Sequence, residues 1–112
     1  MPTTTDLAVR VMKRAGILDP HENPTANESE DVVAMMEGKY AEMKELGLVD
    51  WTLTDIPTRS QEAFISVIAG HVAVEFGRLT PELADLAARG ERTLQLLIER
   101  KEDGRNSPVV DF

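Results

Sequence analysis

The chain has 112 residues, a hydrophobic fraction of 42% and a formal net charge of −8. This length is enough for one domain with its own core but not for two. The charge has the wrong overall sign for a protein whose task is to hold nucleic acid. The sequence contains no cysteine, which excludes disulfides, thiolate nucleophiles and cysteine-type zinc sites.

The longest apolar stretch, AFISVIAGHVAVEF, is interrupted by Ser66 and His71. At about 14 residues it is too short to span a bilayer, and it is better explained as a buried helix. The first ten residues lack the basic start and apolar run of a signal peptide. We therefore expect a protein with no membrane partner.

The first predicted helix spans about residues 5–15. Thr5 is its candidate N-cap, and Lys13 and Arg14 suit the negative end of the helix dipole. Gly16 is expected to end the helix in a left-handed conformation. Apolar residues at spacings of three and four predict a single buried stripe, formed by Leu7, Ala8, Val11, Met12 and Ala15.

The second predicted helix spans about residues 28–46. Asn27 with Glu30 three residues later is a candidate capping box, and Gly47 is the expected end. Gly38 in its interior costs about 1 kcal/mol relative to alanine and is expected to allow another helix to approach closely. The expected inward positions are Val32, Val33, Met36, Tyr40, Met43 and Leu46.

Two more helices follow a connector that contains the only tryptophan, Trp51. The helix at about 57–76 is apolar nearly all round, which is typical of a helix that is central or sandwiched between partners. The helix at about 81–101 begins after Thr80 as N-cap and ends at Asp103 and Gly104. The sequence thus predicts an all-α fold, with a four-helix bundle-like domain at 1–103 and an extended C-terminal tail at 104–112.

Enzyme signatures are missing from the sequence, which has no glycine-rich phosphate loop, no zinc-protease histidine pair and no nucleophile elbow. His71 and Glu75 share a helical spacing of four, but a stable metal site needs three or four ligands, and only one other histidine exists. A structural role for His71 is the simpler interpretation. We expect no catalytic residue, no cofactor and no metal.

The chain has more apolar surface than one four-helix monomer is expected to hide. Met35 and Met36 are adjacent and cannot both face one core, so one of them is expected at a contact with another chain. The candidate subunit interface is formed by Met35, Phe64, Ile68, Val72 and Phe76.

The second candidate site is the end of the chain, which carries apolar side chains after Pro108 blocks a helix. We expect these residues to bind a partner in extended conformation, by strand addition or by filling pockets. The alternative is that they fold back over their own bundle. The residues in question are Asn106, Ser107, Pro108, Val109, Val110, Asp111 and Phe112.

The order of elements resembles the head–tail connector (adaptor) proteins of tailed bacteriophages, which include tail accessory factors and head-completion proteins. The resemblance covers about residues 5 to 100. It lies in the segments DLAVRVMKRAGIL, ESEDVVAMMEGKYAEMKELGL, IPTRSQEAFISVIAGHVAVEFG and TPELADLAARGERTLQLL. In the second segment Val33, Met36, Tyr40 and Gly47 stand at places comparable to the family's Leu-x-x-Met-Met-x-x-Trp/Tyr…Gly pattern.

The resemblance implies a structural, non-enzymatic role. Such adaptors form a ring, typically twelvefold, below the portal protein in the virion, after synthesis in the host bacterial cytoplasm. They extend the channel through which double-stranded DNA passes without specific recognition, and they provide the platform for the next neck or tail protein. Their C-terminal segment leaves the helices and docks, which would place residues 106–112 on the portal or on a neighbouring subunit.

A second hypothesis belongs to a different class. The net charge of −8 also suits a small acidic regulatory protein, such as an antitoxin-like protein or a DNA-mimic inhibitor that binds a basic partner. The neighbouring genes discriminate between the two. A portal, capsid and tail gene nearby favours the connector, and an adjacent toxin or nuclease gene favours the regulator.

Overall fold

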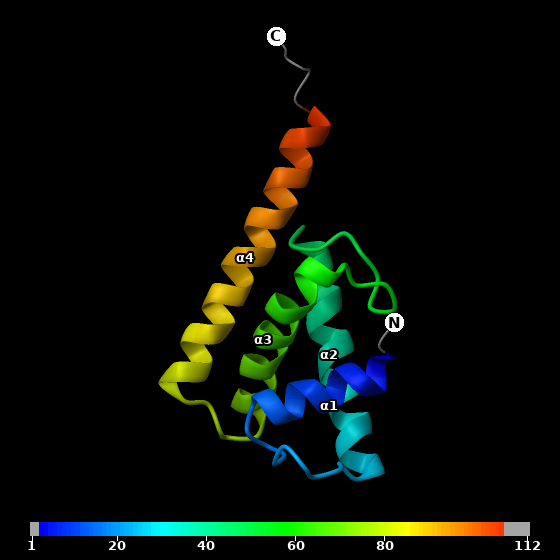
Figure 1. Ribbon diagram of the computed structural model, residues 1–112, viewed down its shortest axis with the longest axis vertical. Helices are drawn as coiled ribbons and strands as arrows, with labels where there is room; N and C mark the ends of the chain where they lie inside the picture. Colours follow the sequence, from blue (N-terminus) through cyan, green and yellow to red (C-terminus); the bar gives the residue numbers. More distant parts are fainter. Residues whose placement is uncertain (1–2, 107–112) are drawn as a thin grey trace.

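The structure is a computed structural model that describes residues 3–106, with the side chains of residues 3–101. Four helices form this part of the chain, and it contains no strand (Figure 1). The all-α, bundle-like fold predicted from the sequence is confirmed. The helices are α1 (Thr4–Arg14), α2 (Ala26–Glu45), α3 (Thr58–Glu75) and α4 (Pro81–Asn106).

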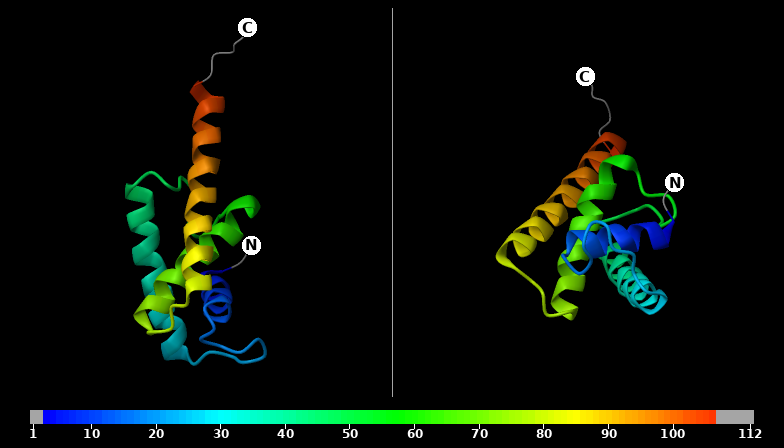
Figure 2. Two further views of the ribbon diagram at one scale, coloured as in Figure 1. Left: turned by 90° about the vertical axis from the view of Figure 1, so that its left-hand side faces the viewer. Right: turned by 60° about the horizontal axis from the view of Figure 1, so that its bottom comes forward.

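The helix α3 is the centre of the fold. It contacts each of the other three helices, α1 and α2 contact each other, and α4 contacts α3 alone among the helices. Figure 1 and the right-hand view of Figure 2 show α4 along one side of the molecule, with α3 between it and the pair α1 and α2. The prediction that the most apolar helix is central is therefore confirmed, and α4 is left with a wide surface that no other helix covers.

Both N-terminal capping boxes lie two residues earlier than expected. The Thr3 side chain accepts from the Asp6 backbone N–H at 3.1 Å, and the Asp6 side chain accepts from the Thr3 backbone N–H. Thr25 and Glu28 make the same reciprocal pair at the start of α2. In α1 the reciprocal box satisfies two backbone donors that the helix itself leaves free, which favours Thr3 over a single cap at Thr5.

The first three helices each end at a glycine in left-handed conformation, as predicted for Gly16 and Gly47. Gly16, Gly47 and Gly77 all have positive φ, between 67° and 76°. The fourth helix does not end in this way, because α4 continues through Gly104 to Asn106. The predicted boundary at 104 is corrected, since a glycine costs a helix only about 1 kcal/mol and ends it only where the backbone turns left-handed.

The core contains residues that were predicted to face a partner. Phe64, Ile68 and Val72 are fully buried within this chain, so their assignment to a subunit interface is wrong. The physical reason is the central position of α3, whose several apolar faces are covered by α1, α2 and α4. The stripe predicted for α1 is confirmed, because Leu7 and Val11 have no exposed surface.

Two glycines set the distance between α3 and α4. A Cβ added at Gly70 would lie 2.6 Å from the Ala87 Cβ, and one added at Gly90 would lie 2.6 Å from the Ala63 carbonyl oxygen. Both separations are shorter than real contacts, so the helices pack more closely than larger residues permit. Gly38 has open space around it, so the interpretation that it allows close helix approach is wrong.

Candidate partner-binding surface

The helix α4 is longer than the helix that supports it. It has 26 residues and α3 has 18, so at about 1.5 Å per residue α4 is about 12 Å longer. The two helices run antiparallel, because Ala87 meets Gly70 and Gly90 meets Ala63. The last turns of α4 consequently project past the start of α3 (Figure 1).

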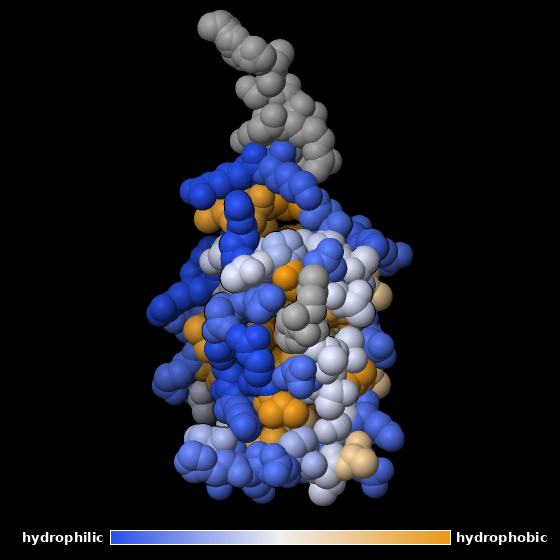
Figure 3. All heavy atoms as spheres, turned by 45° about the vertical axis from the view of Figure 1, so that its right-hand side comes forward, coloured by the Kyte–Doolittle hydropathy of each residue, from blue (hydrophilic) through white to orange (hydrophobic). Residues whose placement is uncertain are grey.

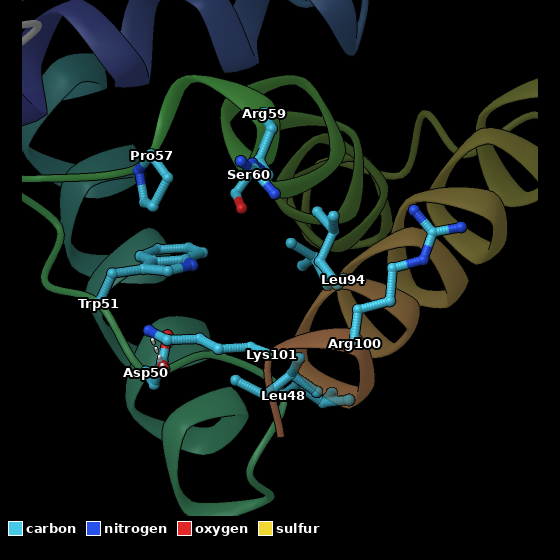
Figure 4. A pocket seen from close by; sticks show the side chains of 11 residues that line it. Leu48, Asp50, Trp51, Pro57, Arg59, Ser60, Leu94, Arg100 and Lys101 are labelled. Carbon is cyan, nitrogen blue, oxygen red and sulfur yellow. Dashed lines mark hydrogen bonds and ion pairs between the residues drawn. The ribbon is translucent and has the colours of Figure 1, made fainter. Parts of the chain in front are cut away.

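An apolar pocket lies at the base of this projection, between α4, the start of α3 and the connector at residues 46–57. We call it the α4 pocket, and its volume is about 440 Å³. Figure 4 shows its side chains arranged around an open centre, and Figure 3 shows an apolar hollow bordered by hydrophilic residues near the end of α4. The apolar lining residues are Leu48, Trp51, Pro57, Leu94, Leu97 and Ile98.

The position of the Trp51 indole is fixed by contacts with Phe64 and Tyr40. Its ring meets Phe64 edge to face, with the ring centroids 5.2 Å apart. The hydroxyl of Tyr40 donates a hydrogen bond of 2.5 Å to the Trp51 carbonyl oxygen. Trp51 is half-buried, with one part in the core and another in the pocket wall. This arrangement fixes an aromatic surface at the opening, which is the kind of rigid group that anchors partners.

The polar residues of the α4 pocket are mainly cationic. Lys101 forms an ion pair with Asp50 at 2.6 Å, which ties α4 to the connector across one side of the opening (Figure 4). Arg59 and Arg100 also line the pocket, and neither makes an ion pair within residues 3–101. The site therefore carries local positive charge on a chain whose net charge is −8.

The main ionic contact between α1 and α3 lies about one helical turn along α3 from Arg59 of the α4 pocket. Glu62 accepts hydrogen bonds from Arg14 at 2.5 Å and from Arg10. The hydrogen bond from Arg14 is the largest cause that holds the pKa of Glu62 below its ordinary value, and the charges of both arginines act in the same direction against desolvation. Arg14 also donates to the Ser66 hydroxyl at 3.2 Å.

We expect the Glu62→Gln substitution to lower the free energy of unfolding by about 1 kcal/mol or less near neutral pH, because the carboxylate is largely exposed and screened. The folded-state pKa is lowered, so the stabilisation is present above the ordinary value of 4.5 and is lost as the pH falls through the folded-state pKa. Denaturant unfolding of both proteins from pH 7 to pH 3 should show the difference closing. Glu37→Gln is the control, because Glu37 makes no ion pair within residues 3–101. A difference that is constant with pH would contradict the assignment.

A second apolar surface lies at the other end of the α3–α4 pair. Val74, Phe76 and Leu79 are 56%, 39% and 46% exposed there. Val74 and Leu79 line a shallow groove of about 320 Å³ together with Gly70 and the alanines of the first turns of α4. The two apolar surfaces thus lie at opposite ends of the same helix pair.

The predicted partner-binding residues have different outcomes. Phe76 is exposed, as an interface residue must be, and Met35 is half-buried and packed against the core. Asn106 is the last residue of α4 and not part of an extended segment. The other tail positions, Ser107, Pro108, Val109, Val110, Asp111 and Phe112, lie outside the described residues.

The α4 pocket itself was missed by sequence reasoning. Leu94, Leu97 and Ile98 have the three- and four-residue spacing of a buried helix face, but only Leu94 is fully covered within the described part of the chain. The sequence signal for the pocket is the length of the apolar face of α4. This face continues beyond the point at which the shorter, antiparallel α3 can cover it.

Other chemistry has little support in residues 3–101. No group of three histidine, aspartate or glutamate side chains there could hold a metal ion. His71 is half-buried and lines the shallow groove beside Val74. No helix in this part of the chain is both long and apolar enough to cross a membrane.

Comparisons of the chain with family models, with curated proteins and with solved structures find no match.

Proposed function

We propose that this protein is a head–tail connector of a tailed bacteriophage. In this proposal, copies of the chain form a ring below the portal protein, extend the DNA channel and present a platform to the next neck or tail protein. The role is structural and non-enzymatic, and its place is the virion. The order of the four helices and the residues that begin and end them support it.

The observation that carries the proposal is the uncovered surface of α4. A ring needs two different faces on each subunit, because one face of a copy must meet the other face of the next copy. The helix pair α3–α4 has an apolar surface at each end, the α4 pocket and the surface at Val74, Phe76 and Leu79. Exposed apolar surfaces of this kind mark contacts with other proteins.

The charge of the chain supports passage of DNA without binding. With a net charge of −8, a ring of many copies carries a large negative charge that repels phosphate groups. Arg59 and Arg100, which make no ion pair within residues 3–101, line a pocket with apolar walls and are suited to a protein partner. Binding of DNA by the isolated chain is therefore expected to be negligible at physiological salt.

Deletion of residues 107–112 tests the proposal, because the tail is assigned to an assembly contact. We expect the shortened chain to keep its thermal unfolding midpoint, since every buried apolar residue identified lies between Leu7 and Leu94. We expect its complex with the portal protein of the same phage to be lost, as measured by co-elution in size-exclusion chromatography. Leu96→Asp is the control, because Leu96 is 55% exposed and lines neither apolar surface. A shortened chain that still co-elutes with the portal would contradict the assignment of the tail.

The acidic regulator stays as the second proposal, supported by the net charge. It predicts a stable complex with a basic protein, such as a nuclease encoded next to it, and no ring on any portal. Co-expression of the chain with the products of its neighbouring genes, followed by purification of the complex, separates the two functions.

A further inference from the structure

We propose that the α4 pocket is the receptor for residues 107–112 of a second copy of this chain, so that copies link head to tail. The inference goes beyond the connector role and does not require it, because both halves of the contact are present in this one chain. The tail of one copy would enter the pocket of the next, and its own pocket would receive the tail of the copy before it.

The chemistry of the segment matches that of the pocket. Residues 107–112 read SPVVDF, with three large apolar side chains and one carboxylate. The pocket offers apolar walls and two arginines, Arg59 and Arg100, that make no ion pair with the residues whose side chains are described. Its volume of about 440 Å³ lies within the range of pockets that bind ligands, roughly 300–1,000 Å³.

The alternation of side chains in an extended segment gives the fit a definite orientation. Successive side chains point to opposite faces, so Val110 and Phe112 share one face and Asp111 lies on the other. With Val110 and Phe112 against Trp51 and the leucines of α4, the Asp111 carboxylate faces away from the apolar wall. There it can pair with the arginines of the rim, a charge-assisted contact that specifies the register.

The geometry favours a second copy over the chain's own tail. From Asn106 to Leu94 the helix rises about 18 Å, and six residues span at most about 20 Å when fully extended. A tail that returned to its own pocket would first have to reverse direction, and a tight turn takes four residues. Too little chain would be left for Phe112 to reach Leu94 and Trp51.

A contact of this type has a consequence for assembly. The tail and the pocket are different surfaces of the same chain, so the contact is heterologous, and repeating it produces a closed ring or an open chain of copies. Two copies joined by one such contact leave one pocket and one tail free, so that further copies can add. A pair that exchanges its tails reciprocally is the closed alternative and stops at a dimer. Growth beyond a dimer as the concentration rises is the result expected for the head-to-tail arrangement.

The test uses two full-length variants that each lack one half of the contact. Ile98→Glu places a carboxylate in the pocket wall, and the double substitution Val110→Asp with Phe112→Asp makes the tail polar. We expect the unmodified chain to increase in mass in analytical ultracentrifugation between about 1 µM and about 1 mM, and each variant alone to stay a monomer. An equimolar mixture of the two variants should form dimers and nothing larger, because it contains one working pocket and one working tail.

Two controls are needed. One excludes loss of folding in the variants, and the other excludes non-specific hydrophobic association. Circular dichroism must show that both variants keep the helical content and thermal midpoint of the unmodified chain. Leu96→Asp, an equal change of charge on the exposed side of α4, should associate as the unmodified chain does. The single Trp51 gives a second readout, because its emission should shift when a peptide of residues 106–112 is added to the tail variant.

The proposed ion pair between the tail carboxylate and a pocket arginine is tested by exchanging the charges of Arg100 and Asp111. Arg100→Glu and Asp111→Lys should each weaken association at least about tenfold, and the double variant should recover most of the loss if the two groups meet. Recovery would support the register proposed here, and no recovery would overturn it.

Three results would overturn the proposal. These are an unmodified chain that stays monomeric throughout the concentration range, variants that associate as it does, or a mixture that stays monomeric. None of these results bears on portal binding, which is measured separately with the portal protein present. The connector proposal can therefore fail or survive independently of this contact.

Discussion

The Phe64→Ala substitution is expected to lower the free energy of unfolding by about 3–5 kcal/mol, the range for truncating a fully buried phenylalanine. Phe64 has no exposed surface and packs edge to face with the rings of Tyr40 and Trp51, which also contact each other. Removing its ring leaves a cavity and takes away the support of Trp51. Because small domains are stable by only about 5–15 kcal/mol, the variant should be close to unfolded at 37 °C.

Phe76→Ala is the matched control for this experiment. Phe76 lies on the same helix end as the exposed Val74 and is itself 39% exposed. Its truncation should cost clearly less, about 1 kcal/mol. Urea unfolding followed by circular dichroism measures both variants. Equal losses would mean that Phe64 is not in the core of the monomer and would restore its assignment to a subunit interface.

The second large effect is expected at the contact between α3 and α4. Gly90→Ala should lower the free energy of unfolding by about 1–3 kcal/mol, although alanine is the better helix former. The added Cβ would lie 2.6 Å from the Ala63 carbonyl oxygen, and a backbone atom cannot move aside as a flexible side chain can. The helices would have to separate, and α4 has no other helix to hold it.

Gly38→Ala is the matched control on α2. No atom lies within 4 Å of a Cβ built there, so the substitution should raise the free energy of unfolding by about 0.5–1 kcal/mol through helix propensity alone. The two substitutions are chemically identical and differ only in their surroundings. Opposite signs in thermal unfolding are the expected result, and stabilisation by both would contradict the close contact at Gly90.

The helices were predictable because their signals are local. The stripe on α1 and the glycines at 16, 47 and 77 depend on residues a few positions apart. The exact N-caps were not predictable, since Thr3 and Thr5 are both good caps and the choice depends on which one gains the reciprocal bond from Asp6. Because threonine is a favourable N-cap at either position, the local sequence does not decide between Thr3 and Thr5.

The partners of each helix could not be predicted in the same way. An all-round apolar helix indicates that several neighbours cover it, but the sequence does not say whether these belong to the same chain. Phe64 and Ile68 were assigned to another copy for that reason, whereas α1, α2 and α4 supply the cover. The α4 pocket was hidden for a related reason, because Trp51 and Ile98 come together only through the antiparallel packing of α3 and α4.

The all-α fold is confirmed, and two proposals about assembly build on it. The fold leaves α4 projecting with a pocket at its base. The connector proposal gives that projection a place in a ring, and the proposed tail contact gives the ring a mechanism of closure.

Electron microscopy of the full chain mixed with the portal protein of the same phage tests the connector proposal most directly. The account predicts a closed ring of helical density on one end of the portal, with α4 of each copy at the border with the next copy. Portal particles without added density, at an excess of the chain and at physiological salt, would contradict the central claim that this protein is a head–tail connector.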